Sequence, residues 1–163
     1  MQLSPKFESL VSDTFVDTIE LAAPLCDLGM VSVPFYILQK NGKLNDEEQA
    51  IMQKHTSIGA QIMEDIKGDG DYNDFIDMSC DITKYHHERW DGSGYPYGIA
   101  GNEVPLPAQV VSLISYYNAL TEHRSYRDAY SKEEAIAILE EESGKAFNPE
   151  IFTICKKISR QLK

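Results

Sequence analysis

The chain has 163 residues, of which 42% are hydrophobic and 10% aromatic, so we expect residues 1–163 to form one globular domain with its own core. Its net charge of −11, from 26 acidic and 15 basic residues, repels phosphates and argues against general DNA or RNA binding. The absence of an apolar run of ~18 residues, of a signal peptide and of any CxxC pair indicates a cytoplasmic protein that binds no membrane.

The first part of the chain predicts helices, because apolar residues recur at helical spacing and no segment alternates as a strand does. Residues 8–28 form the first predicted helix, which Pro24 splits or kinks. Asn45 followed by Glu48 is the pattern of a capping box. A second helix should therefore begin after Asn45 and continue to residue 66.

The rest of the chain predicts further helices around one irregular segment. Residues 75–87 form a helix that carries two adjacent histidines at its C-terminal end, and residues 91–104 form a turn-rich loop. Later helices are expected to begin at Pro107, after Ser131 and at Pro149. This order predicts an all-α bundle with one long functional loop between helices.

The histidine pair, His86 and His87, opens the stretch HHERWDGSGYP. Histidine is a common metal ligand, although capping and packing at a helix end also explain such a pair. Adjacent residues of a helix point about 100° apart, so the pair should not easily chelate one ion together. Two ions, or one ion and one substrate contact, fit that geometry better.

The segment HHERWDGSGYPYGIAGNEVPL resembles the signature of the HD-GYP family, a bacterial branch of the HD metal-dependent phosphohydrolases that hydrolyses cyclic di-GMP. The segments that begin at Val33 and Ala119 resemble the sequence after the family's HD doublet and the family's tail. The resemblance runs from about Leu21 to Phe152 and implies an HD-domain helical bundle with a GYP loop. Domains of this family commonly follow receiver or sensor domains, so this chain could be one module of a larger regulator.

The resemblance carries four metal ligands of the family onto identical residues here: Asp27, His55, His86 and His87. Three or four ligands suffice for zinc or iron. Cys26 could join them as a thiolate, but a lone buried cysteine is usually a small apolar residue. The implied cofactor is none, or a single divalent metal (iron, manganese or zinc) at partial occupancy.

Five other family positions carry different residues here: Cys26, Met30, Gln109, Ser115 and Asn118. The family has a ligating His at position 26, a Lys at 30, an Arg at 109 and Asp at 115 and 118. A two-metal hydrolase needs carboxylates to hold both ions and to lower the pKa of the attacking water. We therefore expect no two-metal centre, and no confident catalytic residue remains.

The nonmetal half of the family's site is better kept. Three basic residues match positions that contact phosphate in the family: Lys40, Arg124 and Arg127. Two solvated surface arginines are the plain alternative for the last two. The GYP turn is intact: Gly94, Tyr95 and Pro96. We expect the turn to serve recognition, with Tyr95 as an exposed anchor, although packing within the loop is an equal alternative for this ring.

Two functions follow from the resemblance. The first is a degenerate HD-GYP domain that recognises a GGDEF-type cyclase domain, another signalling protein or cyclic di-GMP, with phosphodiesterase activity lost or severely impaired. The alternative is an active metal-dependent cyclic di-GMP phosphodiesterase with an altered, single-metal site. The absence of Asp at positions 115 and 118 weighs against the alternative.

Overall fold

The computed structural model of this chain describes residues 5–67, 73–123 and 128–159. Within these ranges the backbone forms helices and turns without a strand, and one isolated bridge joins Ser143 to Phe147. The expected all-α fold is therefore confirmed. In the same ranges, every helix is too short or too polar to cross a membrane.

The N-terminal segment differs from the single helix expected over residues 8–28. Ser12 caps α2, which ends at Ala22, and two short 3-10 helices follow. Pro24 lies at the start of the first of these and has no amide hydrogen with which to continue the α-helical ladder. The elements of this segment are α1 (Pro5–Glu8), α2 (Asp13–Ala22), η1 (Ala23–Leu25), η2 (Leu28–Ser32) and α3 (Phe35–Leu38).

The helix expected from Asn45 to residue 66 forms as two helices, α4 (Asp46–Gln53) and α5 (His55–Lys67). The predicted capping box is present, because the Asn45 side chain accepts from the Glu48 amide at 2.9 Å and the Glu48 carboxylate accepts from the Asn45 amide at 2.8 Å. The break falls at the residue between the two helices, and it makes His55 the first residue of α5.

The later helices follow the sequence prediction closely, and both Ser131 and Asn148 cap the helices they precede. One difference matters for the site: the helix expected over residues 75–87 ends at Tyr85. The elements are α6 (Asp74–Tyr85), η3 (Gly101–Glu103), α7 (Leu106–Thr121), α8 (Lys132–Glu142) and α9 (Pro149–Ile158).

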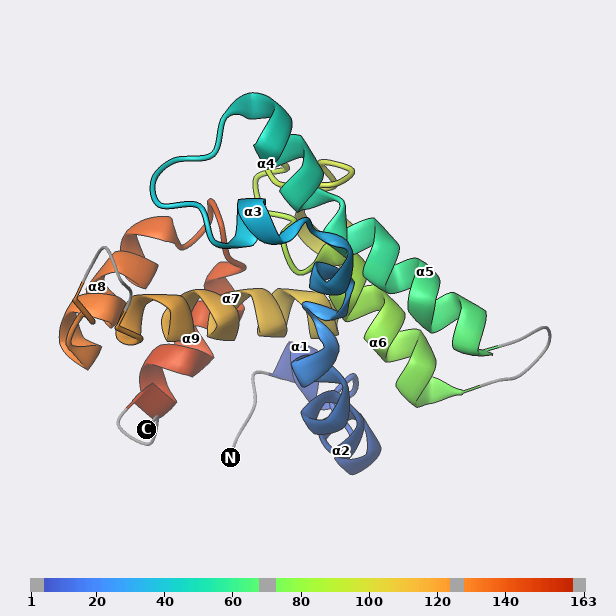
Figure 1. Ribbon diagram of the computed structural model, residues 1–163. Coiled ribbons are helices and arrows are strands. Elements are labelled where there is room, and N and C mark those ends of the chain that lie inside the picture. Colours follow the sequence, from blue (N-terminus) through green and yellow to red (C-terminus); the bar gives the residue numbers. More distant parts are fainter. Residues whose placement is uncertain (1–4, 68–72, 124–127, 160–163) are drawn as a thin grey trace.

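Helix α7 lies across the middle of the molecule, with the α5–α6 pair on one side and α8 and α9 on the other (Figure 1). On one side Leu113 is buried in a cluster with Leu139 and Phe152, from α8 and α9. On the other side Val111 is buried with Ile82 of α6. Because α7 belongs to both clusters, it fixes α6 and the loop after α6 relative to the C-terminal helices.

Candidate metal centre

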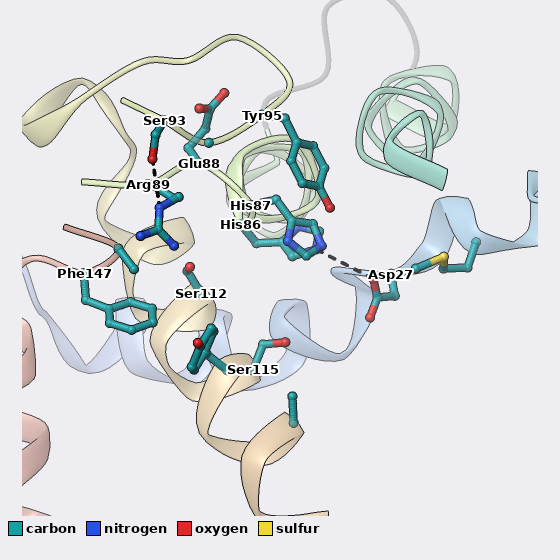
Figure 2. A pocket seen from close by; sticks show the side chains of 15 residues that line it. Asp27, His86, His87, Glu88, Arg89, Ser93, Tyr95, Ser112, Ser115 and Phe147 are labelled. Carbon is teal, nitrogen blue, oxygen red and sulfur yellow. Dashed lines mark hydrogen bonds and ion pairs between the residues drawn. The ribbon is translucent and has the colours of Figure 1, made fainter. Parts of the chain in front are cut away.

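Four residues from separate parts of the sequence converge beside the C-terminal end of α6. Asp27 lies between η1 and η2, His55 opens α5, and His86 and His87 follow α6. One ligand atom from each lies within 4.8 Å of all the others. The Asp27 carboxylate is 3.5 Å from His55 Nε2 and 3.7 Å from His86 Nε2. Figure 2 shows Asp27 facing the histidine pair across this gap.

The rings of the histidine pair lie closer together than the 100° separation of adjacent helical residues suggested. His86 is the C-cap of α6, and the Glu88 amide donates to Tyr85 O at 2.9 Å, so the chain turns at this point. The two imidazole centroids are only 4.1 Å apart. Both rings contribute a ligand atom to the same group, so the geometry does not match the expectation that the pair should not easily chelate one ion together.

The hydrogen bonds of the buried histidines leave one nitrogen of each ring for a ligand. His55 Nδ1 lies 2.7 Å from Met52 O, and His86 Nδ1 lies 3.0 Å from Ile82 O. A carbonyl oxygen only accepts, so each Nδ1 carries a hydrogen, and in the neutral ring Nε2 is the nitrogen with the lone pair. Both Nε2 atoms are buried and find no hydrogen-bond partner among the described residues. Backbone carbonyls hold metal-ligating histidines in this way, so the site fits a metal ion.

The protonation states suit a cation as well. Burial, followed by repulsion from His86, lowers the pKa of His87 to about 3. Burial also lowers the pKa of His55. The interaction with His86 lowers the pKa of the Asp27 carboxyl. For His55, His87 and Asp27 these shifts favour the neutral imidazole and the ionised carboxylate, the forms in which such side chains bind metals.

Cys26 precedes Asp27 but does not join the group of ligand atoms found among the described residues. Its side chain packs against the small core cluster that contains Ala22 and Ile82. Burial, and then the charge of Asp27, raise the pKa of the Cys26 thiol to about 11. The structure therefore favours the apolar interpretation of Cys26 over the thiolate ligand.

The GYP turn folds back onto the histidines. The Tyr95 ring stacks on His87, with centroids 4.7 Å apart and planes 18° apart, and meets the edge of His55 at 6.4 Å. Figure 2 shows the Tyr95 hydroxyl directed toward the histidine pair. Tyr95 is half-buried, so the expectation that it is an exposed anchor is wrong. The Tyr95 amide donates a hydrogen bond to His87 O, and the ring is turned inward. Pro96 is exposed, and Gly94 lines the cavity below.

Two charged residues of the same stretch were not predicted as part of the site. Glu88 is only 3% exposed, and its carboxylate accepts from the Tyr97 amide at 2.7 Å. Arg89 donates to Ser93 Oγ at 3.0 Å and to the Glu142 carboxylate at 2.7 Å. The sequence held one signal for both residues, their position directly after the histidine pair. Charged residues so close to a candidate site are rarely buried without a partner, so partners could have been expected for them.

Two cavities meet at Asp27 and Ser115. The first, of about 450 Å³, is lined by His86, His87 and Tyr95 (Figure 2). The second, of about 620 Å³, is lined by apolar side chains and by several polar ones: Glu20, Cys26, Asp27, Ser115, Asn118 and Glu122. His86 and His87 therefore line the first cavity only, the substituted positions Cys26 and Asn118 line the second only, and Ser115 lines both.

The remaining predicted residues are dispersed. Met30 lines the first cavity. Lys40 forms an ion pair with Glu48 and is not among the residues that line either cavity. Gln109 accepts from the Asn148 side chain at 2.9 Å, which gives it a structural contact. Two predicted phosphate contacts lie outside the described residues: Arg124 and Arg127.

Comparison with known proteins identifies relatives over most of the chain. The family described as HD domain matches residues 8–151. A probable cyclic di-GMP phosphodiesterase of Vibrio cholerae is 40% identical over 145 residues, which is 88% of this chain and 33% of the relative. The cyclic di-GMP phosphodiesterase response regulator RpfG of Xanthomonas campestris is 38% identical, over 85% of this chain and 35% of the relative.

Other relatives carry a different substrate in their names. A 3′3′-cGAMP-specific phosphodiesterase of Vibrio cholerae is 35% identical, over 86% of this chain and 26% of the relative. The chain thus spans about a third of the length of the curated relatives it matches. A crystal structure of a cyclic GMP-AMP phosphodiesterase from the same species superposes with a TM-score of 0.64 at 14% identity, over 96% of this chain and 41% of that one. At that identity the likeness concerns the fold alone.

Proposed function

The chain belongs to the HD domain family, and on this premise we propose that it is a degenerate member that acts in bacterial cyclic di-GMP signalling. In this proposal it holds at most one divalent metal ion and hydrolyses cyclic di-GMP weakly or not at all. The names of its relatives support the class of ligand, and the substituted residues support the loss of activity.

The observation that carries the proposal is that Asp27 has a complete ligand set for one ion, whereas the substituted positions nearby offer no charged ligand for a second. The four candidate ligands are all present. At the substituted positions stand the neutral thiol of Cys26 and the hydroxyl of Ser115, neither of which matches the charge of a second ion. Glu20 and Glu122 also line the second cavity, but among the described residues neither joins Asp27 in a group of three or more ligand atoms.

The ligands of the one ion would be a carboxylate oxygen of Asp27, the Nε2 atoms of His55 and His86, and a ring nitrogen of His87. When bound, a divalent ion supplies Lewis-acid polarisation of a phosphoryl group. The backbone carbonyls behind His55 and His86 hold both rings in the ligating tautomer. Iron, manganese and zinc all accept imidazole and carboxylate together, so the residues do not select one of them.

We place a cyclic dinucleotide in the first cavity in this proposal, in preference to a protein docked on the loop. Tyr95 and Tyr116 line that cavity and offer aromatic surface to a nucleobase. Arg89 lies at the cavity wall, where its charge is shared with Glu142. Docking of a GGDEF-type cyclase domain on the loop stays a prediction, and it would have to use the exposed Pro96 and Tyr97 rather than Tyr95.

An active phosphodiesterase with a single-metal site is the second candidate. The specific observation in its favour is that both buried histidines present unpartnered Nε2 atoms toward Asp27. Loss of a residue that orients a metal ligand commonly reduces activity about 10–100-fold, and loss of a direct metal ligand should reduce it further. We therefore rank this candidate below the degenerate one.

The test compares the natural chain with a variant in which the family's residues are restored, Cys26→His with Ser115→Asp. Each protein is expressed in medium supplemented with iron, manganese or zinc, and its metal content is measured by elemental analysis. Hydrolysis of cyclic di-GMP is followed by chromatography, and its binding by calorimetry. We expect at most one ion per natural chain, more than one in the restored variant, and hydrolysis at least ~100-fold faster in the restored variant.

The result that contradicts the degenerate function is equally clear. If the natural chain holds two ions, or hydrolyses cyclic di-GMP as fast as the restored variant, the natural chain is an active enzyme. Binding of cyclic di-GMP without hydrolysis supports the nucleotide-recognition form of the proposal. Absence of binding leaves protein recognition as the function to be tested.

A further inference from the structure

His87 is held differently from the other two histidines of the site. Backbone carbonyls fix the rings of His55 and His86, whereas no hydrogen bond to the His87 ring is found among the described residues. The ring of His87 instead contacts other rings: His86 at 4.1 Å, His55 edge-on at 5.1 Å, and Tyr95 in a parallel stack at 4.7 Å. Tyr95 is the one among these rings that is not itself a candidate ligand.

The stack is fixed by the loop that carries it. The Tyr95 amide donates to His87 O at 3.2 Å, so the two residues of the stack are also joined through their backbones. At Gly94 a Cβ would lie 2.4 Å from the Arg89 amide nitrogen, which shows how closely the loop lies on the turn after α6. Beyond Tyr95, the buried Glu88 carboxylate accepts from the Tyr97 amide. The ring is therefore held from both sides before any ligand arrives.

We propose that Tyr95 is a positioning residue of the metal site, whose ring holds the His87 imidazole in its ligating orientation. This inference rests on the proposed single-metal site. Residues that orient a metal ligand typically change metal affinity by about 10–100-fold. Stacking is the function assigned to the ring, so the phenol oxygen is not required for it.

The experiment measures cobalt(II) binding by the full chain after metal removal. Cobalt gives a visible absorption band whose shape depends on coordination geometry, which a purely structural role would not alter. Tyr95→Leu removes the stack, and Tyr95→Phe keeps it. Tyr97→Leu is the matched control, because Tyr97 is an exposed aromatic of the same loop whose ring lies against Tyr85 and not against the histidines. Circular dichroism verifies the helix content of each protein.

We expect Tyr95→Leu to bind cobalt about tenfold more weakly than the natural chain and with an altered band. Tyr95→Phe and Tyr97→Leu should match the natural chain in both measurements. If Tyr95→Leu loses helix content, Tyr95→Met fills a similar volume without a ring and takes its place.

Three outcomes overturn the proposal. Unchanged affinity and band in Tyr95→Leu mean that the stack does not position His87. Equal losses in Tyr95→Phe and Tyr95→Leu assign the effect to the hydroxyl instead of the stack. If the natural chain binds no cobalt, the metal site itself is contradicted, and this inference with it. The first two outcomes contradict only the inference and leave the proposed function unchanged.

Discussion

Gly29 of η2 and Gly59 of α5 lie in direct backbone contact. A Cβ added to Gly29 would stand 2.7 Å from Gly59 N and 1.9 Å from His55 O. Through this contact the segment that carries Asp27 packs against the first turn of α5. Because α5 begins with His55, the same contact sets the distance between two candidate ligands. The Thr83 hydroxyl adds a second tie by donating to Leu25 O at 3.2 Å.

Gly29→Ala should therefore destabilise the fold and weaken metal binding together. The added methyl meets backbone atoms that cannot rotate away, so we expect a loss of about 3 kcal/mol or more in the free energy of unfolding. The control is Gly42→Ala, where φ is +118° and no atom lies within 4 Å. That change should cost about 1–2 kcal/mol from backbone strain and leave metal affinity unchanged. Urea unfolding and a metal titration test both, and equal losses in the two variants would contradict the packing argument.

Asp27→Asn should lower the affinity for a divalent metal by more than about 100-fold, since it removes the one carboxylate of the group. Glu20→Gln is the matched control, because it neutralises a carboxylate of the neighbouring cavity without touching the four candidate ligands. Competition with a chelator of known affinity measures both proteins. Comparable losses would mean that general negative charge, rather than coordination, attracts the ion.

The parts of the fold that depend on nearby residues could be predicted from the sequence. The capping boxes at Asn45 and Ser131 are examples, since each needs only a residue three positions away. The geometry of the site could not be predicted in the same way. The turn that brings His86 and His87 to one point, and the inward rotation of Tyr95, depend on contacts made after α6 has ended. Family resemblance named the four candidate ligands, but it did not reveal that two cavities share Asp27 and Ser115.

Zinc should raise the melting temperature of the metal-free protein, because an ion that binds only the folded state stabilises it. At a free concentration 100 times the dissociation constant the gain is about 2.7 kcal/mol. For a chain of this size that corresponds to a rise of about 5–10 °C. Magnesium should produce little change, since it prefers oxygen ligands and the group supplies three imidazoles. A zinc effect that persists in His86→Ala would place the ion elsewhere.

The capping box of α8 should make a small part of the stability depend on pH. Bonds from the Ser131 amide and hydroxyl lower the pKa of the Glu134 carboxyl. A carboxyl with a lowered folded pKa stabilises the fold above its unfolded pKa of about 4.3, and this contribution disappears as the pH falls through the folded value. Glu134→Gln should therefore be less stable than the natural chain at neutral pH and converge with it in acid. Urea unfolding at neutral and at acid pH measures both proteins, and a difference between them that does not change with pH would contradict the role of the charge.

Glu88→Ala should loosen the loop that covers the histidines. The Glu88 carboxylate is buried and receives the Tyr97 amide, and its second oxygen finds no hydrogen-bond partner among the described residues. Hydrogen bonds to charged groups are worth about 1.5–3 kcal/mol, so the alanine variant should lose stability of that order. Glu88→Gln keeps an acceptor for the Tyr97 amide and should lose less. Because the same loop carries Tyr95, the alanine variant should also show the altered cobalt band expected of Tyr95→Leu. If Glu88→Ala is less stable but keeps the natural cobalt spectrum, the loop contributes to stability without setting the geometry of the metal site, and this prediction is wrong.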